Sequence, residues 1–368
     1  MLLAVSSLTG LVNKDTRMAL PFLNGTRKKR DQVLAVDLGG RITKAVHLQR
    51  RGDNFTLCRY SLLDAPIFEK SLSADLLKEH LAALSQNFDP KLKHVALTIG
   101  VNDALVRHVE MPAMPADDMR AVLKHNSRAY LQQDLTGYVF DCFQPPEARG
   151  KDHGKGAAKQ KVLIAGAKKQ LIDEFVTATK NAGFIPDHIV PGVIGPVNAF
   201  ERALPEVFAK QVVALVDIGF RSSSISILQE GELILNRVVG IGGDRLTAGL
   251  SESMNISYAE AEGIKIGMAG EVQGALEPLL TPLGRELRAS IDFFEHQQDR
   301  TVSQVYLSGG SARSEFVVQM MRQELMVECK NWNPVSFLKS ALPPEQTAEI
   351  EQVAPQLTVA VGAALTAL

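Results

Sequence analysis

One local pattern occurs twice in this sequence and limits the folds that the chain can adopt. In VLAVDLGGRITKAVHLQRRG (residues 33–52), an apolar run ends at Asp37, two glycines follow, and alternating residues resume. ALVDIGFRSSSISILQEGELI (residues 214–234) repeats the design, with Asp217 as the acid. Strand-forming runs joined by a glycine turn predict a β-hairpin. Because helical patterns follow each hairpin, the repeat predicts two α/β lobes with a cleft between them.

Length and composition agree with a two-lobed globular protein. At 368 residues the chain is long enough for two or three domains, and its 45% hydrophobic and 22% charged residues are ordinary for a folded protein. A formal net charge of −1 gives no basis for binding nucleic acid. No apolar run approaches the roughly 18 residues of a membrane span. The three cysteines are too far apart for a disulfide framework or a metal site.

The acid and glycines of each hairpin suggest a phosphate site. A glycine turn can curl its backbone N–H groups around an anion, because glycine allows close approach. An acid just before the turn can hold a magnesium ion, usually through its waters. Asp37, Gly39 and Gly40 would form one side of such a site. Asp217, Gly219 and Ser222 to Ser224 would form the other. A single copy of this pattern is more often an ordinary turn than a phosphate site. With two copies at matching positions, the two interpretations are about equally favoured.

Two further segments fit a nucleotide. In VYLSGGSAR (residues 305–313), Gly309 and Gly310 follow an apolar strand, where they form either an ordinary strand-to-helix loop or a platform for a base or sugar. In YAEAEGIKIG (residues 258–267), Glu262 and Lys265 share one helical face at i, i+3. This pair is either a surface ion pair, worth a fraction of a kcal/mol, or a bracket for a ribose and an adenine edge.

Together these segments resemble the nucleotide site of the actin, Hsp70 and sugar-kinase superfamily. Within it the chain most resembles the PilM family of type IV pilus assembly proteins, with the division protein FtsA next. The resemblance runs from about residue 31 to the end. It is carried by VRHVEMPAMPADDMRAVLKHNSRAYL (residues 106–131), VVGIGGDRLTAGL (residues 238–250) and LGRELRASIDFFEHQ (residues 283–297).

The resemblance implies an α/β, actin-like and ribonuclease-H-like two-lobed fold with an inserted FtsA/PilM-type subdomain. Residues 1–30 would be a flexible leader. The first lobe would comprise residues 31–208, with the inserted subdomain at about 91–164. The second would comprise residues 209–368, with a helical subdomain at about 246–305.

The resemblance also implies ATP and Mg²⁺ as cofactors. Asp37 and Asp217 would position the metal ion. The remaining nucleotide-binding positions would be Gly39, Gly40, Lys44, Gly219, Ser222, Ser223, Gly242, Gly243, Glu262, Lys265, Gly309, Gly310 and Ser311.

The sequence departs from its relatives at three positions of this site. Gly40 and Arg41 replace the serines usual in the first turn, and we expect Arg41 to point to solvent rather than to phosphate. Ser224 replaces a common acid. Gly195 stands before Pro196, where catalytically active relatives carry an acid that orients the attacking water. Orienting water is a large part of what a phosphoryl-transfer site contributes, so we expect ATP binding with weak or absent hydrolysis, and no catalytic residue is assigned.

By resemblance, the protein would be a nucleotide-gated adaptor of a type IV pilus, or a related type II secretion, assembly machine. It would bind the cytoplasmic tail of a PilN-like bitopic inner-membrane protein through a groove on or near the inserted subdomain. It would thus lie at the cytoplasmic face of the membrane. Other pilus proteins and a second copy of the chain are further possible partners.

Two alternative functions remain open. An FtsA-like division protein would anchor through a C-terminal amphipathic helix, whereas QLTVAVGAALTAL (residues 356–368) is apolar and uncharged. A small-molecule kinase of the same fold would need a catalytic acid, and Gly195 counts against it. Sugar-dependent ADP formation would distinguish the kinase from the adaptor.

Overall fold

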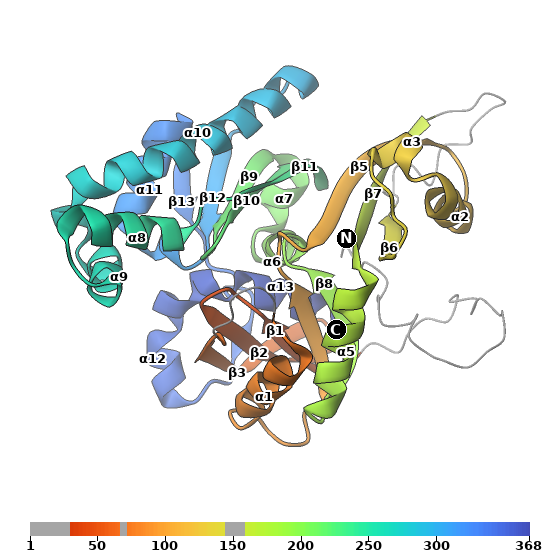
Figure 1. The fold of residues 1–368 in the computed structure, drawn as a ribbon, viewed down its shortest axis with the longest axis horizontal. Helices are drawn as coiled ribbons and strands as arrows, with labels where there is room; N and C mark the ends of the chain where they lie inside the picture. The colour runs from red at the N-terminus through yellow and green to blue at the C-terminus, as the bar shows by residue number, and fades with distance from the viewer. Residues whose placement is uncertain (1–29, 67–71, 144–158) are drawn as a thin grey trace.

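The computed structural model describes residues 30–66, 72–143 and 159–368. They form two lobes, each built on a mixed β-sheet, with a smaller three-stranded subdomain at one side (Figure 1). The expected leader, residues 1–30, lies outside the described residues except for Arg30. The two-lobed α/β organisation predicted from the repeated hairpin is therefore present.

The first lobe is a six-stranded sheet whose strands alternate between two apolar layers. In β1, Leu34 and Val36 pack in one core cluster, whereas Val33 and Ala35 pack in the other, as the two-residue period of a strand requires. Helices α1 and α5 cover the first face, and α6 and α13 cover the second. The sheet order is β14-β3-β2-β1-β4-β8. Its main elements are β1 (Gln32–Asp37), β2 (Ile42–Arg51), β3 (Asn54–Asp64), α1 (Ala74–Ser85), β4 (His94–Ile99), α5 (Lys169–Asn181), β8 (Ile185–Pro191), α6 (Ile194–Ala203) and α7 (Pro205–Lys210).

The second lobe repeats the pairing scheme of the first. β9 pairs antiparallel with β10 and parallel with β12, as β1 pairs antiparallel with β2 and parallel with β4. The sheet order is β11-β10-β9-β12-β13. Its elements are β9 (Val212–Ile218), β10 (Ser223–Gln229), β11 (Glu232–Val239), α8 (Gly243–Met254), α9 (Tyr258–Gly267), η2 (Ala269–Glu271), α10 (Gln273–Gln298), β12 (Gln304–Ser308), η3 (Ser311–Arg313), α11 (Glu315–Leu325) and β13 (Cys329–Asn331).

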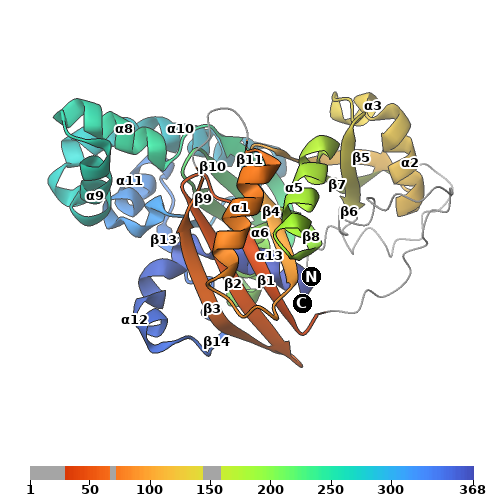
Figure 2. The ribbon, with the colours of Figure 1, turned by 60° about the horizontal axis from the view of Figure 1, so that its bottom comes forward.

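The inserted subdomain has its own sheet and its own small core, and it projects from the first lobe (Figures 1 and 2). β7 is its central strand, flanked by β5 and β6. The expected boundaries of 91–164 need correction, because β4 lies within them yet pairs with β1 and β8, and β7 continues past them to Lys168. The sequence did not show that β4 and β5, which are neighbours along the chain, join different sheets. The elements are β5 (Ala104–Pro112), α2 (Ala116–Asn126), α3 (Arg128–Leu131), β6 (Tyr138–Phe143) and β7 (Lys159–Lys168).

The C-terminal segment returns to the first lobe, which corrects the expected second-lobe range of 209–368. β14 pairs with β3, and α13 packs on α6, β1 and β2. Helix α13 is apolar on all sides and is buried almost throughout, so it requires a position between layers rather than on a surface. The elements are β14 (Lys339–Ser340), α12 (Pro344–Val353), η4 (Ala354–Gln356) and α13 (Thr358–Ala367).

Among the residues that the structure describes, no helix combines the length and the apolarity that crossing a bilayer would require.

Candidate functional site

The two repeated hairpin turns meet between the lobes. A Cβ atom added to Gly40, in the first turn, would lie 3.2 Å from Cδ1 of Phe220 and 3.3 Å from Cγ of Arg221, in the second. β1 and β9 therefore bring Asp37 and Asp217, at or next to their last residues, to the same region between the lobes.

Asp37 is held by two side chains of its own lobe. The hydroxyl of Thr98, at the end of β4, donates to Oδ1 at 3.0 Å. Lys44, the register partner of Asp37 on β2, donates from Nζ to Oδ2 at 3.1 Å. Lys44, which we expected to contact phosphate, thus contacts Asp37 in this structure. A phosphate bound beside Asp37 would also lie within reach of Lys44.

Asp217 has an equivalent support in the second lobe. The hydroxyl of Ser308, its register partner on β12, donates to Oδ1 at 2.9 Å. Burial raises the pKa of Asp217; the Ser308 hydrogen bond and the charge of Lys44 act against this rise, and the charge of Asp37 adds to it. The two aspartates and Lys44 are therefore close enough to influence one another electrostatically.

This donor set suits magnesium bound together with phosphate. Mg²⁺ prefers oxygen ligands and is commonly held by one or two carboxylates, with waters and substrate phosphates completing its shell. The described residues contain no cluster of three or more His, Cys, Asp or Glu side chains that could hold a metal ion alone. Two carboxylates, one from each lobe, fit a magnesium site that is completed by phosphate and water. They do not fit a site in which protein side chains supply every ligand.

The turn glycines are required by close packing within the hairpins. A Cβ atom at Gly39 would overlap the carbonyl of Ile42 and the Nζ of Lys44, and one at Gly219 would lie 2.7 Å from the carbonyl oxygen of Ser222. A side chain at either glycine would therefore displace the turn from the position that aims its aspartate.

The two serines of the second turn differ in what they contact. The Oγ of Ser222 accepts a hydrogen bond from Nδ2 of Asn102 in the first lobe, at 3.2 Å. The fully buried Ser223 donates from Oγ to the carbonyl of Ile241 at 2.7 Å. Ser223 therefore fastens β10 to the segment before α8, a structural role that its position after the turn did not reveal.

Gly242 and Gly243 join the second hairpin to the remaining motifs. The backbone N–H of Gly243 donates to the carbonyl of Gly219 at 2.8 Å. A Cβ atom at Gly243 would lie 2.6 Å from Oγ of Ser311 and 3.3 Å from Nζ of Lys265, and one at Gly242 would overlap the backbone of the second turn. Segments that are far apart in sequence are thus brought together at the start of α8.

Glu262 and Lys265 form a buried network, which rules out the surface ion pair. Lys265 is 4% exposed and donates to Oε2 of Glu262 at 2.7 Å, to Oγ1 of Thr247 at 2.7 Å and to the carbonyl of Gly243 at 3.1 Å. Burial lowers the pKa of Lys265, with Glu262 acting in the opposite direction. For Glu262, burial opposes ionisation, but hydrogen bonds from Lys265 and Thr247 outweigh it and lower the pKa. Thr247 was missed from sequence, where it resembled an ordinary helix residue.

Gly309 and Gly310 have different roles in the loop after β12. Gly309 has φ +93°, and a Cβ atom there would collide with the backbone of Ile218, so this position needs glycine. Gly310 is exposed, and a Cβ atom would meet no heavy atom within 4 Å. The exposed backbone at Gly310, beside Ser311, is the part of the loop that could form a platform.

Arg41 does not simply point to solvent, which corrects the expectation for this residue. Its NH1 lies 3.2 Å from Oε2 of Glu262 on α9, in the second lobe. Its guanidinium also lies over two rings of that lobe, 5.9 Å from the centroid of Phe220 and 5.8 Å from that of Tyr258. Arg41 therefore links the first turn to α9, a contact between distant segments that no local pattern could reveal.

Gly195 is a packing residue at the start of α6. A Cβ atom there would lie 2.7 Å from the carbonyl oxygen of Val359 and 2.8 Å from its Cα, on α13. This position therefore has no room for an acidic side chain.

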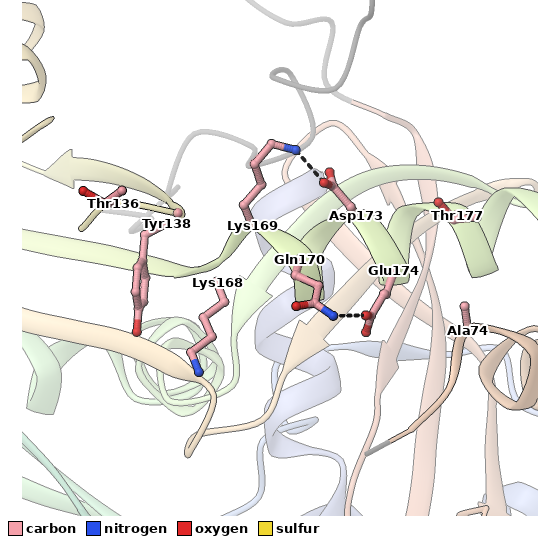
Figure 3. Close-up of a pocket in the computed structure, with 10 residues that line it drawn as sticks. Ala74, Thr136, Tyr138, Lys168, Lys169, Gln170, Asp173, Glu174 and Thr177 are labelled. Atoms are coloured by element: carbon pink, nitrogen blue, oxygen red, sulfur yellow. Dashed lines mark hydrogen bonds and ion pairs between the residues drawn. The ribbon is translucent and has the colours of Figure 1, made fainter. Parts of the chain in front are cut away.

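A separate groove lies where the inserted subdomain joins the first lobe (Figure 3). Its volume is about 670 Å³, and it includes none of the residues around the two aspartates. Lys169 and Gln170, at the start of α5, are paired with Asp173 and Glu174 one turn later. The groove is lined by these four residues and by Ala74, Thr136, Gly137, Tyr138, Lys168 and Thr177. No sequence pattern indicated it, because its walls come from three separate segments of the chain.

Comparison with known proteins agrees with this architecture. Residues 35–368 match the family described as type IV pilus assembly protein PilM. A PilM–PilN type IV pilus biogenesis complex superposes with a TM-score of 0.80 over 92% of this chain and 99% of the other, at 21% identity. The ethanolamine utilization protein EutJ from Carboxydothermus hydrogenoformans gives 0.53 over 92% and 90%, at 18% identity.

A shorter similarity links the chain to the cell division protein FtsA of Bacillus subtilis (strain 168). It is 32% identical over 103 residues, which is 28% of this chain and 22% of FtsA. The match therefore spans under a quarter of that relative. These likenesses confirm the expected actin-like fold.

Proposed function

The chain belongs to the PilM family of type IV pilus assembly proteins, and on that premise we propose that it is a nucleotide-gated adaptor of a type IV pilus or related type II secretion machine. The observation that carries the proposal is the meeting of Asp37, Lys44 and Asp217 at the facing turns of two lobes. A ligand bound there contacts both lobes, so its binding energy depends on their relative arrangement.

We assign Mg-ATP to this site. Asp37 and Asp217 hold the magnesium ion, which neutralises phosphate charge when bound. Lys44 adds a second positive charge beside Asp37, and the tight turns at Gly39, Gly40 and Gly219 bring backbone N–H groups close to the phosphates. Glu262, Lys265, Gly310 and Ser311 surround the adenosine. Thr247, Lys265 and Arg41 all contact Oε2 of Glu262, so a ribose hydroxyl would approach Oε1.

We expect hydrolysis to be weak or absent. A phosphoryl-transfer site acts mainly by positioning and by stabilising charge, and the close contact of Gly195 with α13 leaves no room there for a water-orienting acid. The bound nucleotide would then act as a lasting conformational signal rather than as a substrate that is rapidly consumed.

The partner we propose is the cytoplasmic tail of a PilN-like bitopic inner-membrane protein, bound in the groove beside the inserted subdomain. The structural relative with a TM-score of 0.80 is a PilM–PilN complex. The groove offers an aromatic side chain, Tyr138, and charges of both signs on α5, which suits a mixed apolar and charged peptide. Binding this tail would hold the protein at the cytoplasmic face of the membrane.

Two contacts support communication between the nucleotide site and this subdomain. Asn102 bonds to Ser222 in the second hairpin and lies two residues before β5 begins. On β5 itself, His108 lies beside the backbone of Leu233 on β11. The inserted subdomain therefore contacts both lobes, so a change in their angle alters its position. ATP can favour one angle only through a difference in affinity for the two arrangements.

A binding titration tests the proposal. Purified protein is titrated with Mg-ATP by calorimetry while free phosphate is followed in the same sample, and binding of a labelled synthetic PilN tail is measured with and without ATP. We expect saturable ATP binding, phosphate release near background, and tighter tail binding with ATP. Asp217→Ala should lose ATP binding. Asp53→Ala, at an exposed position in the turn between β2 and β3, should bind ATP like the wild type.

Each possible failure has its own meaning. Lack of ATP binding at millimolar concentration would contradict the nucleotide site and leave a partner-binding scaffold. Rapid phosphate release stimulated by a sugar would favour the kinase alternative. For the FtsA-like alternative, α13 is a core helix and is not available as a membrane anchor.

A further inference from the structure

Each aspartate of the candidate site receives a hydrogen bond from the strand beside it. Thr98 is the second-to-last residue of β4, the parallel neighbour of β1, and donates to Oδ1 of Asp37. Ser308 is the last residue of β12, the parallel neighbour of β9, and donates to Oδ1 of Asp217. The same atom of the same residue type is held in the same way in both lobes. The internal repeat therefore extends beyond the hairpins to a hydroxyl on the next strand.

These two hydroxyls differ in what they contact from the buried hydroxyls of Thr179 and Ser223. Both residues are 1% exposed, so each hydroxyl needs a partner inside the protein. Buried Thr179 and Ser223 donate to backbone carbonyls, which serves the fold alone. Thr98 and Ser308 donate instead to the carboxylates that a bound metal would require.

We propose that Thr98 and Ser308 are positioning residues of the nucleotide site, each fixing the orientation of one metal-binding aspartate. The inference rests on the proposed nucleotide function. A hydrogen bond to Oδ1 fixes the rotation of the carboxylate and so fixes the direction of Oδ2. In Asp37 that second oxygen already faces a cation, the Nζ of Lys44. Groups that orient metal ligands commonly contribute about 10- to 100-fold to metal affinity.

The test separates the metal-dependent part of binding from the rest. Thr98→Val and Ser308→Ala remove one hydroxyl each, and Thr98→Ser and Ser308→Thr retain it. Thr179→Val is the matched control, since it removes a buried hydroxyl from α5. For each folded variant, the Kd of ATP is measured by calorimetry with excess Mg²⁺ and again with EDTA, and urea unfolding reports stability.

We expect Thr98→Val and Ser308→Ala each to weaken Mg-ATP binding about tenfold and to change metal-free ATP binding less than twofold. The hydroxyl-retaining variants and Thr179→Val should bind Mg-ATP like the wild type. Equal Mg-ATP affinity in the wild type and both hydroxyl-lacking variants would overturn the inference while leaving the proposed function intact. So would an equal loss with and without Mg²⁺, which indicates a structural role. If the wild type binds no Mg-ATP, the proposed function fails, and the inference fails with it.

Discussion

Asp217 illustrates how a residue suited to binding can weaken the fold that carries it. Burial raises its pKa above the ordinary value, so ionisation is less favourable in the folded chain than in the unfolded one. Ser308 and Lys44 offset only part of this effect. Burying a carboxylate near a second one is a cost that a bound cation would relieve.

We therefore predict that Asp217→Asn stabilises the ligand-free protein at neutral pH. Because the folded pKa is raised, the folded state binds more protons than the unfolded state between the two pKa values, and the wild type loses stability as pH rises through that window. Asparagine does not titrate and keeps an oxygen for Ser308. The gain should be small near pH 4 and larger at pH 7.

Urea unfolding of both proteins at pH 4, 5.5 and 7 checks this prediction. Asp53→Asn, at an exposed position, is the control. Its free energy of unfolding should differ from that of the wild type by an amount that does not grow between pH 4 and pH 7. A variant that is less stable than the wild type by a margin growing with pH would contradict the prediction.

The residues at the site could be predicted only where a motif or strand pattern marks them. Asp37, Asp217 and the turn glycines follow from the repeated hairpin. Thr98 and Arg41 do not, because their partners depend on which strands and helices become neighbours in the fold. Ser223 was assigned to the ligand from its position, whereas its hydroxyl bonds to Ile241.

The contact between α6 and α13 depends on two small residues. Gly195 meets Val359, and a Cβ atom at Gly362 would overlap the carbonyl of Gly195. Such close backbone approach is possible only where both helices lack a side chain at the contact.

We predict that Gly195→Asp, which supplies the acid of catalytically active relatives, destabilises the protein and does not produce hydrolysis. Overpacking a close contact costs about 1–3 kcal/mol, and a buried carboxylate adds to this. Thermal unfolding and phosphate release check both parts. Gly274→Asp, at an exposed position in the first turn of α10 where a Cβ atom meets nothing within 4 Å, should be nearly neutral. A stable Gly195→Asp protein with faster phosphate release would refute this account.

Strands and helices were predictable from sequence where they are long and periodic. The hairpin expected in residues 33–52 is present as β1 and β2, which extend from Gln32 to Arg51. The two-residue strand β14 and the helix α12 were not expected from the sequence. The sheet that each strand joins also escaped prediction, because strand pairing between distant segments leaves no local pattern.

The two lobes are joined across the cleft by Arg41 as well as by the chain itself. Its ion pair with Glu262 and its contacts with Phe220 and Tyr258 are half-exposed, so together they contribute only about 1–2 kcal/mol. This is within the usual range of coupling free energies between sites, so such a contact can bias the lobe arrangement without locking it.

We predict that Arg41→Gln broadens the distribution of distances between the lobes in the absence of nucleotide. Nitroxide spin labels are attached to Lys78→Cys on α1 and Glu252→Cys on α8, in a Cys58→Ser background. Double electron–electron resonance then measures the distribution of distances between the two labels. Arg300→Gln removes an exposed ion pair with Glu230 within the second lobe and should leave the distances unchanged. Equal distributions in Arg41→Gln and wild type would show that Arg41 does not hold the lobes together.

The position of α13 has a consequence for how the protein is made. A ribosome releases the first lobe's sheet, except for β14, before the second lobe, whereas α13, which together with α6 covers one face of that sheet, is synthesised after the second lobe. Until then the apolar residues of that face, including Val33 and Val46, lack the part of their cover that α13 provides. The first lobe therefore cannot complete its core until the second lobe has been synthesised, and the nascent chain presents an apolar surface to chaperones during that interval.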